Sequence, residues 1–110
     1  MNAKFCIFKS QVDGNYYYHL KAVNGELVLS GEGYSTRQSC RDGITSVKRN
    51  AGNEQRYERH NSYMNYRFNL LGGNGEIIGR SEGYVTADGR DEGVLVVKRI
   101  AGMAVVDDGS

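Results

Sequence analysis

The chain has 110 residues, 39% hydrophobic and 25% charged, with a formal net charge of +1 at pH 7. This composition is typical of one soluble globular domain over residues 1–110, and so small a net charge gives no general attraction to nucleic acid or to anionic membranes. No apolar run approaches the roughly 20 residues that span a bilayer, and no signal-peptide pattern follows Met1, so we expect a cytoplasmic protein.

The first half of the chain opens with strand patterns. Residues 5–9 form a short apolar run that predicts a strand, and residues 11–15, which contain Asp13-Gly14, predict a turn. Residues 16–23 then alternate, which predicts a half-buried strand. Its predicted core row comprises Tyr16, Tyr18, Leu20 and Ala22, and its predicted outer row comprises Tyr17, His19 and Lys21.

A hairpin and a helix follow. Asn24-Gly25 predicts a turn in which both residues take positive φ, and residues 26–30 return antiparallel. Residues 35–38 fit a capping box in which Ser35 is the N-cap and Gln38 reaches back. Helical spacing continues to Ala51, and Gly52 is expected to end the helix in a left-handed conformation. The predicted buried helical positions are Cys40, Ile44, Val47 and Ala51.

The second half repeats this order. Residues 55–60 alternate in charge, which suits an edge strand, and residues 66–70 repeat the core row with Arg67 and Asn69 outward. Asn74-Gly75 predicts the second hairpin. Thr86 can cap a second helix, although the glycines and the valine-rich run in residues 87–100 disfavour one. Residues 103–107 read as a terminal strand, and the last three residues are expected to fray.

Residues 16–52 and 66–102 share about 15 identities over roughly 37 positions at a constant offset, far above the roughly 2 expected by chance. We therefore assign repeat 1 to about residues 4–52 and repeat 2 to about residues 54–107. The predicted fold is α+β and two-layered, a single antiparallel sheet with two helices on one face. It arises by tandem duplication of a strand-strand-strand-helix(-strand) unit. We expect a monomer with internal pseudo-two-fold symmetry.

The run Gly43-Ile44-Thr45-Ser46-Val47-Lys48-Arg49-Asn50-Ala51 and the junctions at residues 55–59 and 66–70 resemble the YegP-like family of small bacterial proteins. The resemblance covers nearly the whole chain. It implies one antiparallel sheet with exchanged terminal strands and both helices on one face. It carries over no activity, no cofactor and no catalytic residues.

The strongest candidate site is the sheet face that the helices leave uncovered. Aromatic side chains interleaved with basic ones can stack on single-stranded bases. The candidate binding face comprises Tyr17, His19, Lys21, Arg67 and Asn69. An ordinary polar surface, or one that pairs with another copy, remains an alternative.

Several positions are singled out because they recur in both repeats. Gly43 and Gly93 fall inside the predicted helices, where glycine costs about 1 kcal/mol relative to alanine, so we expect close approach of helix to sheet, with a ligand contact as the alternative. The hairpin positions are Asn24, Gly25, Asn74 and Gly75. The basic pairs Lys48-Arg49 and Lys98-Arg99 suit the last turn of a helix, with nucleic-acid binding as the alternative.

Catalytic chemistry is not indicated. Cys6, His19, Cys40 and His60 lack metal-ligand spacing, and no nucleophile elbow, Walker loop or dinucleotide fingerprint occurs. Alignment of the repeats sets Arg56 and Arg90 against Cys6 and Cys40, so we expect two reduced cysteines. We predict a protein that is not an enzyme and that holds no metal or cofactor.

Three functional hypotheses remain. The first is a non-catalytic binding or interaction module that recognises a protein or an extended peptide through the open sheet face or by strand addition. The second is weak binding of single-stranded nucleic acid through Tyr17, Lys21 and Arg67. The third is a small enzyme of unknown reaction.

Overall fold

The computed structural model describes residues 2–108. Seven strands, two α-helices and one short 3-10 helix follow the order expected from the repeat. The first repeat supplies β1 (Lys4–Lys9), β2 (Tyr16–Lys21), β3 (Leu27–Ser30) and α1 (Arg37–Asn50). The second supplies η1 (Glu54–Arg56), β4 (Tyr57–His60), β5 (Arg67–Leu71), β6 (Ile77–Arg80), α2 (Ala87–Ile100) and β7 (Val105–Asp107).

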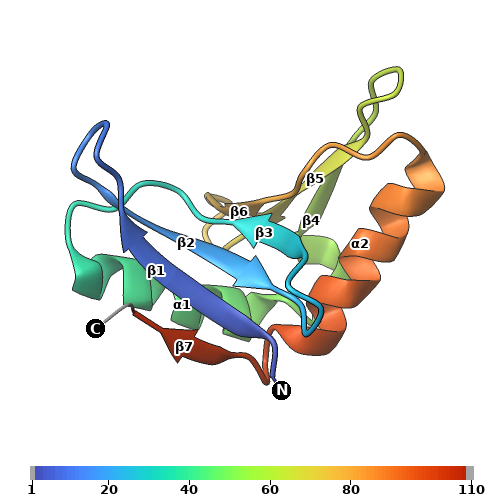
Figure 1. Ribbon diagram of the computed structural model, residues 1–110. Coiled ribbons are helices and arrows are strands. Elements are labelled where there is room, and N and C mark those ends of the chain that lie inside the picture. The colour runs from blue at the N-terminus through green and yellow to red at the C-terminus, as the bar shows by residue number, and fades with distance from the viewer. Residues whose placement is uncertain (1, 109–110) are drawn as a thin grey trace.

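All seven strands form one twisted sheet in the order β4-β5-β6-β3-β2-β1-β7 (Figure 1). The sheet is antiparallel except where β7, from the second repeat, pairs parallel with β1. The prediction of a purely antiparallel sheet is therefore wrong at this edge. The reason is that β7, which follows α2 at the end of the second repeat, lies at the outer edge of the first repeat and runs in the same direction as β1.

The two halves meet at the centre of the sheet, where β3 pairs with β6 through Ser30 and Arg80. These residues occupy equivalent positions of the two repeats, so the pseudo-two-fold axis passes between them. The bridge between Tyr16 and Tyr34 likewise recurs between Tyr66 and Tyr84. The duplicated unit thus completes its sheet by pairing with its own copy.

Both helices lie against the same face of the sheet, and one continuous core fills the space between them (Figure 1). Tyr18 and Leu20 from β2 and Phe68 and Leu70 from β5 have no solvent exposure. Fully burying side chains of this size contributes roughly 1.5–3 kcal/mol each as an upper estimate. The predicted inward rows are therefore confirmed at these four positions, and Tyr16 and Ala22 pack partly buried against the core.

The second helix is present despite its unfavourable sequence. Thr86 is its N-cap and accepts a hydrogen bond from the Gly89 amide at 3.0 Å. Val94 and Val97 are fully buried against the sheet. Tertiary burial therefore outweighs the weak helix propensity of glycine and valine here.

The ends of α1 differ from prediction. Thr36, not Ser35, is the N-cap and accepts from the Ser39 amide at 3.0 Å, while Gln38 donates to Asp42. Gly52 does not take a left-handed conformation. The chain instead leaves α1 through a turn in which the Asn53 amide donates to the Asn50 carbonyl, so no left-handed residue is needed.

The hairpin turns are correctly placed, but their geometry differs from prediction. Gly25 and Gly75 both have φ of 85°, whereas Asn24 and Asn74 are not in the positive-φ region. Each Asn side chain instead accepts a hydrogen bond from the glutamate amide two residues on, at 2.9 and 3.0 Å. This is a three-residue loop in which only the glycine needs left-handed backbone.

The helical glycines do allow a close approach, but to a tyrosine rather than to sheet backbone. A Cβ on Gly43 would lie 2.2 Å from the Tyr34 hydroxyl oxygen, and a Cβ on Gly93 would lie 2.4 Å from that of Tyr84. These tyrosines are partly buried at the strand-to-helix corners. Glycine is therefore required twice by the same ring contact.

The repeats do not align at one offset throughout. Phe5 pairs with Leu20 in the first half, and Tyr57 pairs with Leu70 in the second. The sequence offset between equivalent residues of β1 and β4 is therefore two residues larger than the offset in the rest of the repeat. The turn before β5 is shorter by that amount. The structural counterpart of Cys6 is accordingly Glu58, not Arg56, which lies in η1.

Both sheet ends also refine the predictions. The charged strand is indeed an edge strand, but it begins at Tyr57 after a 3-10 turn. Asp108 is not frayed, because Arg37 donates to its carbonyl oxygen and Arg41 forms an ion pair with its carboxylate. Gly109 and Ser110 lie outside the described residues.

Candidate functional site

One row of side chains crosses all seven strands on the face opposite the helices, which we call the open face. The strand registers place each member beside the next, so their side chains project from the same face. In order across the sheet the row comprises Asp107, Cys6, His19, Ser30, Arg80, Asn69 and Glu58. The predicted residues His19 and Asn69 are in this row, and Tyr17 and Arg67 lie beside it.

The first half of the open face carries an aromatic cluster, formed by Phe8, Tyr17 and His19. The Phe8 ring stacks with Tyr17 at 6.0 Å between centroids and meets the edge of His19 at 4.7 Å. Phe8 is 39% exposed. Sequence reasoning missed it because both parities of β1 are apolar, and only the register with Tyr17 reveals its face.

Polar contacts define the character of this cluster. Partial burial, followed by the nearby Lys21 charge, lowers the pKa of His19, which favours a neutral ring. The Tyr17 hydroxyl donates to the Asp13 carboxylate, and that hydrogen bond raises the tyrosine pKa. The cluster therefore presents three uncharged rings at neutral pH.

The second half of the open face contains a polar depression of about 210 Å³, which we call the cationic hollow. Its lining residues are His60, Arg67, Asn69, Arg80 and Ser81. Arg67 and Asn69 belong to the predicted face, whereas the other three were missed. His60 and Arg80 become recognisable only when β4 and β6 are placed on either side of β5.

Two carboxylates beside the hollow orient its donors. Glu58 Oε1 lies 2.8 Å from His60 Nε2 and accepts from Asn69 Nδ2 at 3.1 Å. Hydrogen bonds from Asn69 and then His60 lower the pKa of Glu58, so it is ionised at neutral pH. Arg80 Nε donates to Glu32 at 2.6 Å, which links the two halves across the centre of the sheet.

Lys21 is set apart from the other predicted residues. It lies at the end of β2, where it also lines a shallow depression of about 570 Å³ with Lys4, Val23 and Val105. Lys4 is paired with Asp107 at 3.9 Å. The structure thus joins four of the five predicted residues to two clusters and leaves Lys21 at the margin.

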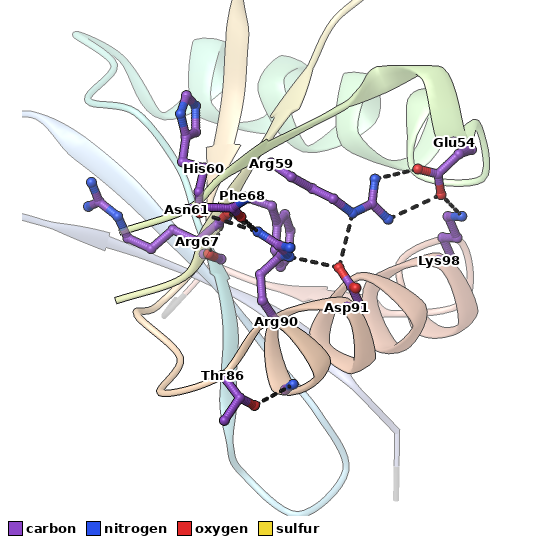
Figure 2. Close-up of polar contacts among 12 residues, drawn as sticks. Glu54, Arg59, His60, Asn61, Arg67, Phe68, Thr86, Arg90, Asp91 and Lys98 are labelled. Atoms are coloured by element: carbon purple, nitrogen blue, oxygen red, sulfur yellow. Dashed lines mark hydrogen bonds and ion pairs between the residues drawn. The ribbon is translucent and has the colours of Figure 1, made fainter. Parts of the chain in front are cut away.

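Beneath the hollow, on the helix side, Arg90 of α2 is nearly buried, with 5% exposure (Figure 2). Its Nη1 donates to Asn61 at 2.8 Å, to the His60 carbonyl at 3.2 Å and to the Arg67 carbonyl at 3.4 Å. His60 and Arg67 are cross-strand partners. Arg90 therefore holds the backbone of His60 and Arg67, whose side chains line the hollow, in place.

An ion-pair chain extends from Arg90 along α2. Asp91 accepts from both Arg90 and Arg59, at 2.7 and 3.1 Å, and Arg59 and Lys98 both contact Glu54 (Figure 2). Hydrogen bonds from Arg59 and then Lys98 lower the pKa of Glu54 to about 2. These ion pairs connect η1, β4 and α2 to one another.

The two cysteines lie at different depths, Cys6 partly buried and Cys40 buried. Burial raises the pKa of Cys40 to about 11, so its thiol stays protonated and unreactive at neutral pH. Both cysteines are free. Within residues 2–108, no group of three or more His, Cys, Asp or Glu residues is placed to hold a metal ion, and neither helix has the length and apolar character that crossing a membrane requires.

These features define a class of α+β proteins with two repeats in one chain. The two repeats share one continuous sheet, are related by a pseudo-two-fold axis, and leave one face of the sheet uncovered. A family model described as "Domain of unknown function (DUF1508)" matches residues 12–58 and again residues 63–108. The chain belongs to this family. The resemblance stated from the sequence is thereby confirmed.

Curated relatives include UPF0339 protein YegP of Yersinia pestis, 44% identical over 55 residues. Another is the UPF0339 protein in ptx operon 5'region of Stutzerimonas stutzeri, 41% identical over 59 residues. These sequence matches cover 49% and 54% of this chain, and the chain spans about half the length of these curated relatives, 49% and 52%. None of these descriptions names an activity.

The fold is shared with solved structures. The solution structure of yegP from E. coli, described as a protein of unknown function, is 37% identical with a TM-score of 0.90, covering 99% of this chain and 94% of that one. UPF0339 protein SO3888 from Shewanella oneidensis is 31% identical with the same TM-score, covering 98% and 92%. The predicted fold class is therefore confirmed, with the parallel edge pair as its correction.

Proposed function

We propose that this protein is a non-catalytic binding module that holds an extended peptide segment of a partner protein on its open face. The observation that carries the proposal is the cross-strand row, which joins the aromatic cluster to the cationic hollow without a break. The rings offer an apolar anchor, and the hollow offers N–H donors. Extended peptides are recognised through hydrogen bonds together with pockets that accept alternate side chains.

The spacing of the two clusters sets the length of the ligand. Three strand intervals separate β2 from β5, which corresponds to roughly 14 Å across the sheet. An extended chain covers this distance with about four residues. The proposal therefore requires an apolar or aromatic side chain about four residues away from a polar anchor.

The open face suits a peptide better than the sheet edges do. The two edge strands are short, four residues in β4 and three in β7. The His60 carbonyl at one edge is already engaged by Arg90, and β4 carries charged side chains that discourage strand addition.

We further propose that the protein is a monomer in the cytoplasm of a bacterial cell. Two free cysteines suit a reducing compartment, and the relatives named above come from bacteria. The pairing of β3 with β6 occupies the edge through which a single repeat would meet a second copy.

A phage library of random dodecapeptides tests the proposal. Panning is carried out on the wild-type protein and on a Phe8→Ala/Tyr17→Ala variant, with circular dichroism as a check on folding. We expect enriched sequences with the stated spacing on the wild type and their loss on the variant. The absence of enrichment, or equal enrichment on both proteins, would contradict the proposal.

A second candidate function is weak binding of single-stranded nucleic acid. It is favoured by the presence of the aromatic cluster on the same sheet face as Arg67 and Arg80, since aromatic stacking and phosphate contacts act together in such proteins. A fluorescent oligothymidylate titrated at low and high salt tests it by anisotropy. Binding that weakens steeply with salt supports this function, and no binding at low salt removes it.

A further inference from the structure

The cationic hollow is lined entirely by polar residues, none of them acidic. Four of the five, His60, Arg67, Asn69 and Arg80, carry side-chain nitrogens that can donate hydrogen bonds. Its volume of about 210 Å³ is several times the roughly 30 Å³ share of one liquid water molecule. A tetrahedral or planar oxyanion fits this space together with bridging water.

The donors of the hollow are not exhausted by the protein. Within residues 2–108, the guanidinium of Arg67 makes no side-chain hydrogen bond or ion pair. Arg80 uses only Nε for Glu32, which leaves both terminal nitrogens without a protein partner in the same range. Two guanidinium groups therefore remain available to the same ligand.

Charge repulsion makes an anion favourable at this position. Asn69 pairs with Arg80, so Arg67 is the diagonal neighbour of Arg80 on the same face. Like charges directly opposite each other destabilise a sheet, and diagonal neighbours are still within reach of side chains as long as arginine. Glu32 and Glu58 are nearby, but the first is paired with Arg80 and the second holds His60 and Asn69, so the Arg67 charge is left without compensation.

The backbone beneath the hollow is fixed before any ligand arrives. Arg90 donates to the His60 and Arg67 carbonyls from the helix side. In Figure 2 the side chains of His60 and Arg67 point away from the Arg90 guanidinium. A ligand would thus meet donors on a rigid strand pair, which lowers the cost of ordering them.

We propose that the cationic hollow binds an oxyanion, a phosphate or carboxylate group, carried by the peptide that the open face holds. Arg67 and Arg80 would contact its oxygens through charge-assisted hydrogen bonds, and Asn69 and His60, which Glu58 holds in place, would line the site beside them. The inference rests on the proposed function for the identity of the carrier. The affinity of the hollow for a free oxyanion does not depend on that function.

Titration of the ¹⁵N-labelled protein by NMR tests the site, with sodium phosphate, sodium acetate and sodium chloride compared at equal ionic strength. We expect saturable shifts confined to the amides of Asn69 and Ser81 and to the arginine Nε signals of Arg67 and Arg80. Arg67→Gln and Arg80→Gln should each weaken binding by about tenfold. Arg49→Gln, which removes the same charge from an exposed position on α1, should leave binding unchanged.

Peptides from the phage selection then separate the sources and the two proposals. Each is compared as a phosphorylated form, a free C-terminal acid and an amide. If the phosphorylated form or the free acid binds more tightly than the amide, and Arg67→Gln removes this difference, the tighter form identifies the oxyanion. Saturable binding of free phosphate or acetate by a protein that enriches no peptide from the phage library contradicts the proposed function alone. Equal binding of all three peptide forms, or oxyanion titrations identical to chloride, would overturn the inference.

Discussion

The symmetry-related halves of the open face carry opposite chemistry on the same backbone. Where the first half places Phe8, Tyr17 and His19, the second places His60, Arg67 and Asn69. On the helix side, the buried Cys40 of α1 is matched by the nearly buried Arg90 of α2. The two halves therefore share one packing frame, and the surface that we propose for binding is among the parts that differ between them.

The comparison teaches which positions the fold requires and which are free to change. Positions that are identical in both halves make the same contact twice, as Gly43 and Gly93 do with their tyrosines. Positions that differ include the open-face pairs Tyr17/Arg67 and His19/Asn69 and, on the helix side, the pair Cys40/Arg90. Four predictions test this division, in decreasing order of the expected effect.

Gly43→Leu and Gly93→Leu should each destabilise the protein by about 3 kcal/mol, because the new side chain collides with the ring of Tyr34 or Tyr84. This corresponds to a Tm lower by about 12 °C or more in thermal unfolding. Gly52→Leu is the control, since no atom lies within 4 Å of its Cβ position. An unchanged Tm in either helix variant would remove the ring contact as the reason for glycine.

Arg90→Met should destabilise the protein by about 2–3 kcal/mol, because the His60 and Arg67 carbonyls and Asn61 lose their donor. Chemical denaturation measures the loss, and amide hydrogen exchange should accelerate in β4 and β5 before it does in β1 and β2. Arg49→Met provides the exposed control. Equal exchange in both halves of the sheet would show that Arg90 does not act locally.

Tyr18→Phe should cost about 1–2 kcal/mol, because the Tyr18 hydroxyl donates to the buried Ile78 carbonyl at 2.6 Å, across the junction of the repeats. The equivalent residue, Phe68, has no hydroxyl, so this bond exists once. Tyr63→Phe, at a residue that is 90% exposed, should have no effect in the same urea titration. If both variants unfold alike, the cross-repeat hydrogen bond contributes nothing to stability.

The acid response of the second half should depend on Glu54. Its pKa falls from 4.5 to about 2 in the folded protein, because Arg59 and Lys98 stabilise the carboxylate. A lowered folded-state pKa means that this stabilisation is complete above pH 4.5 and is lost as the pH falls toward 2. Because the side chain is 55% exposed, solvent screening limits the effect to about 1 kcal/mol or less.

Stability measured against pH for Glu54→Gln checks this assignment. The variant should show a shallower decline between pH 4.5 and pH 2 than the wild type. Glu76→Gln, at an exposed hairpin position, serves as the control. A decline in Glu54→Gln as steep as in the wild type would contradict the role of this carboxylate.

Much of the fold could be predicted because the repeat constrains it twice. The alternation in residues 16–23 and 66–70 identified the buried rows, and the identity of the repeats indicated α2 where local propensity did not. The parallel β1–β7 pair could not be predicted in the same way. It joins segments about 100 residues apart, and a three-residue strand carries no pattern that reveals its direction.

The candidate site could be predicted only in part. Tyr17, His19, Arg67 and Asn69 were found because their strands alternate clearly. Phe8 and Arg80 were missed because β1 is apolar on both faces and β6 is a short strand that contains a glycine. Arg90 was missed because a buried arginine needs hydrogen-bond acceptors, and here these are backbone carbonyls that only the tertiary structure brings close to it.

The most direct test of the account is a chemical-shift map of the ¹⁵N-labelled protein with a peptide from the phage selection. We predict simultaneous shifts on both halves of the open face, at residues of the aromatic cluster and of the cationic hollow, with α1 and α2 unaffected. Shifts confined to the helices, or to the outer edge of β4 or β7, would contradict the claim that the uncovered face is the binding surface.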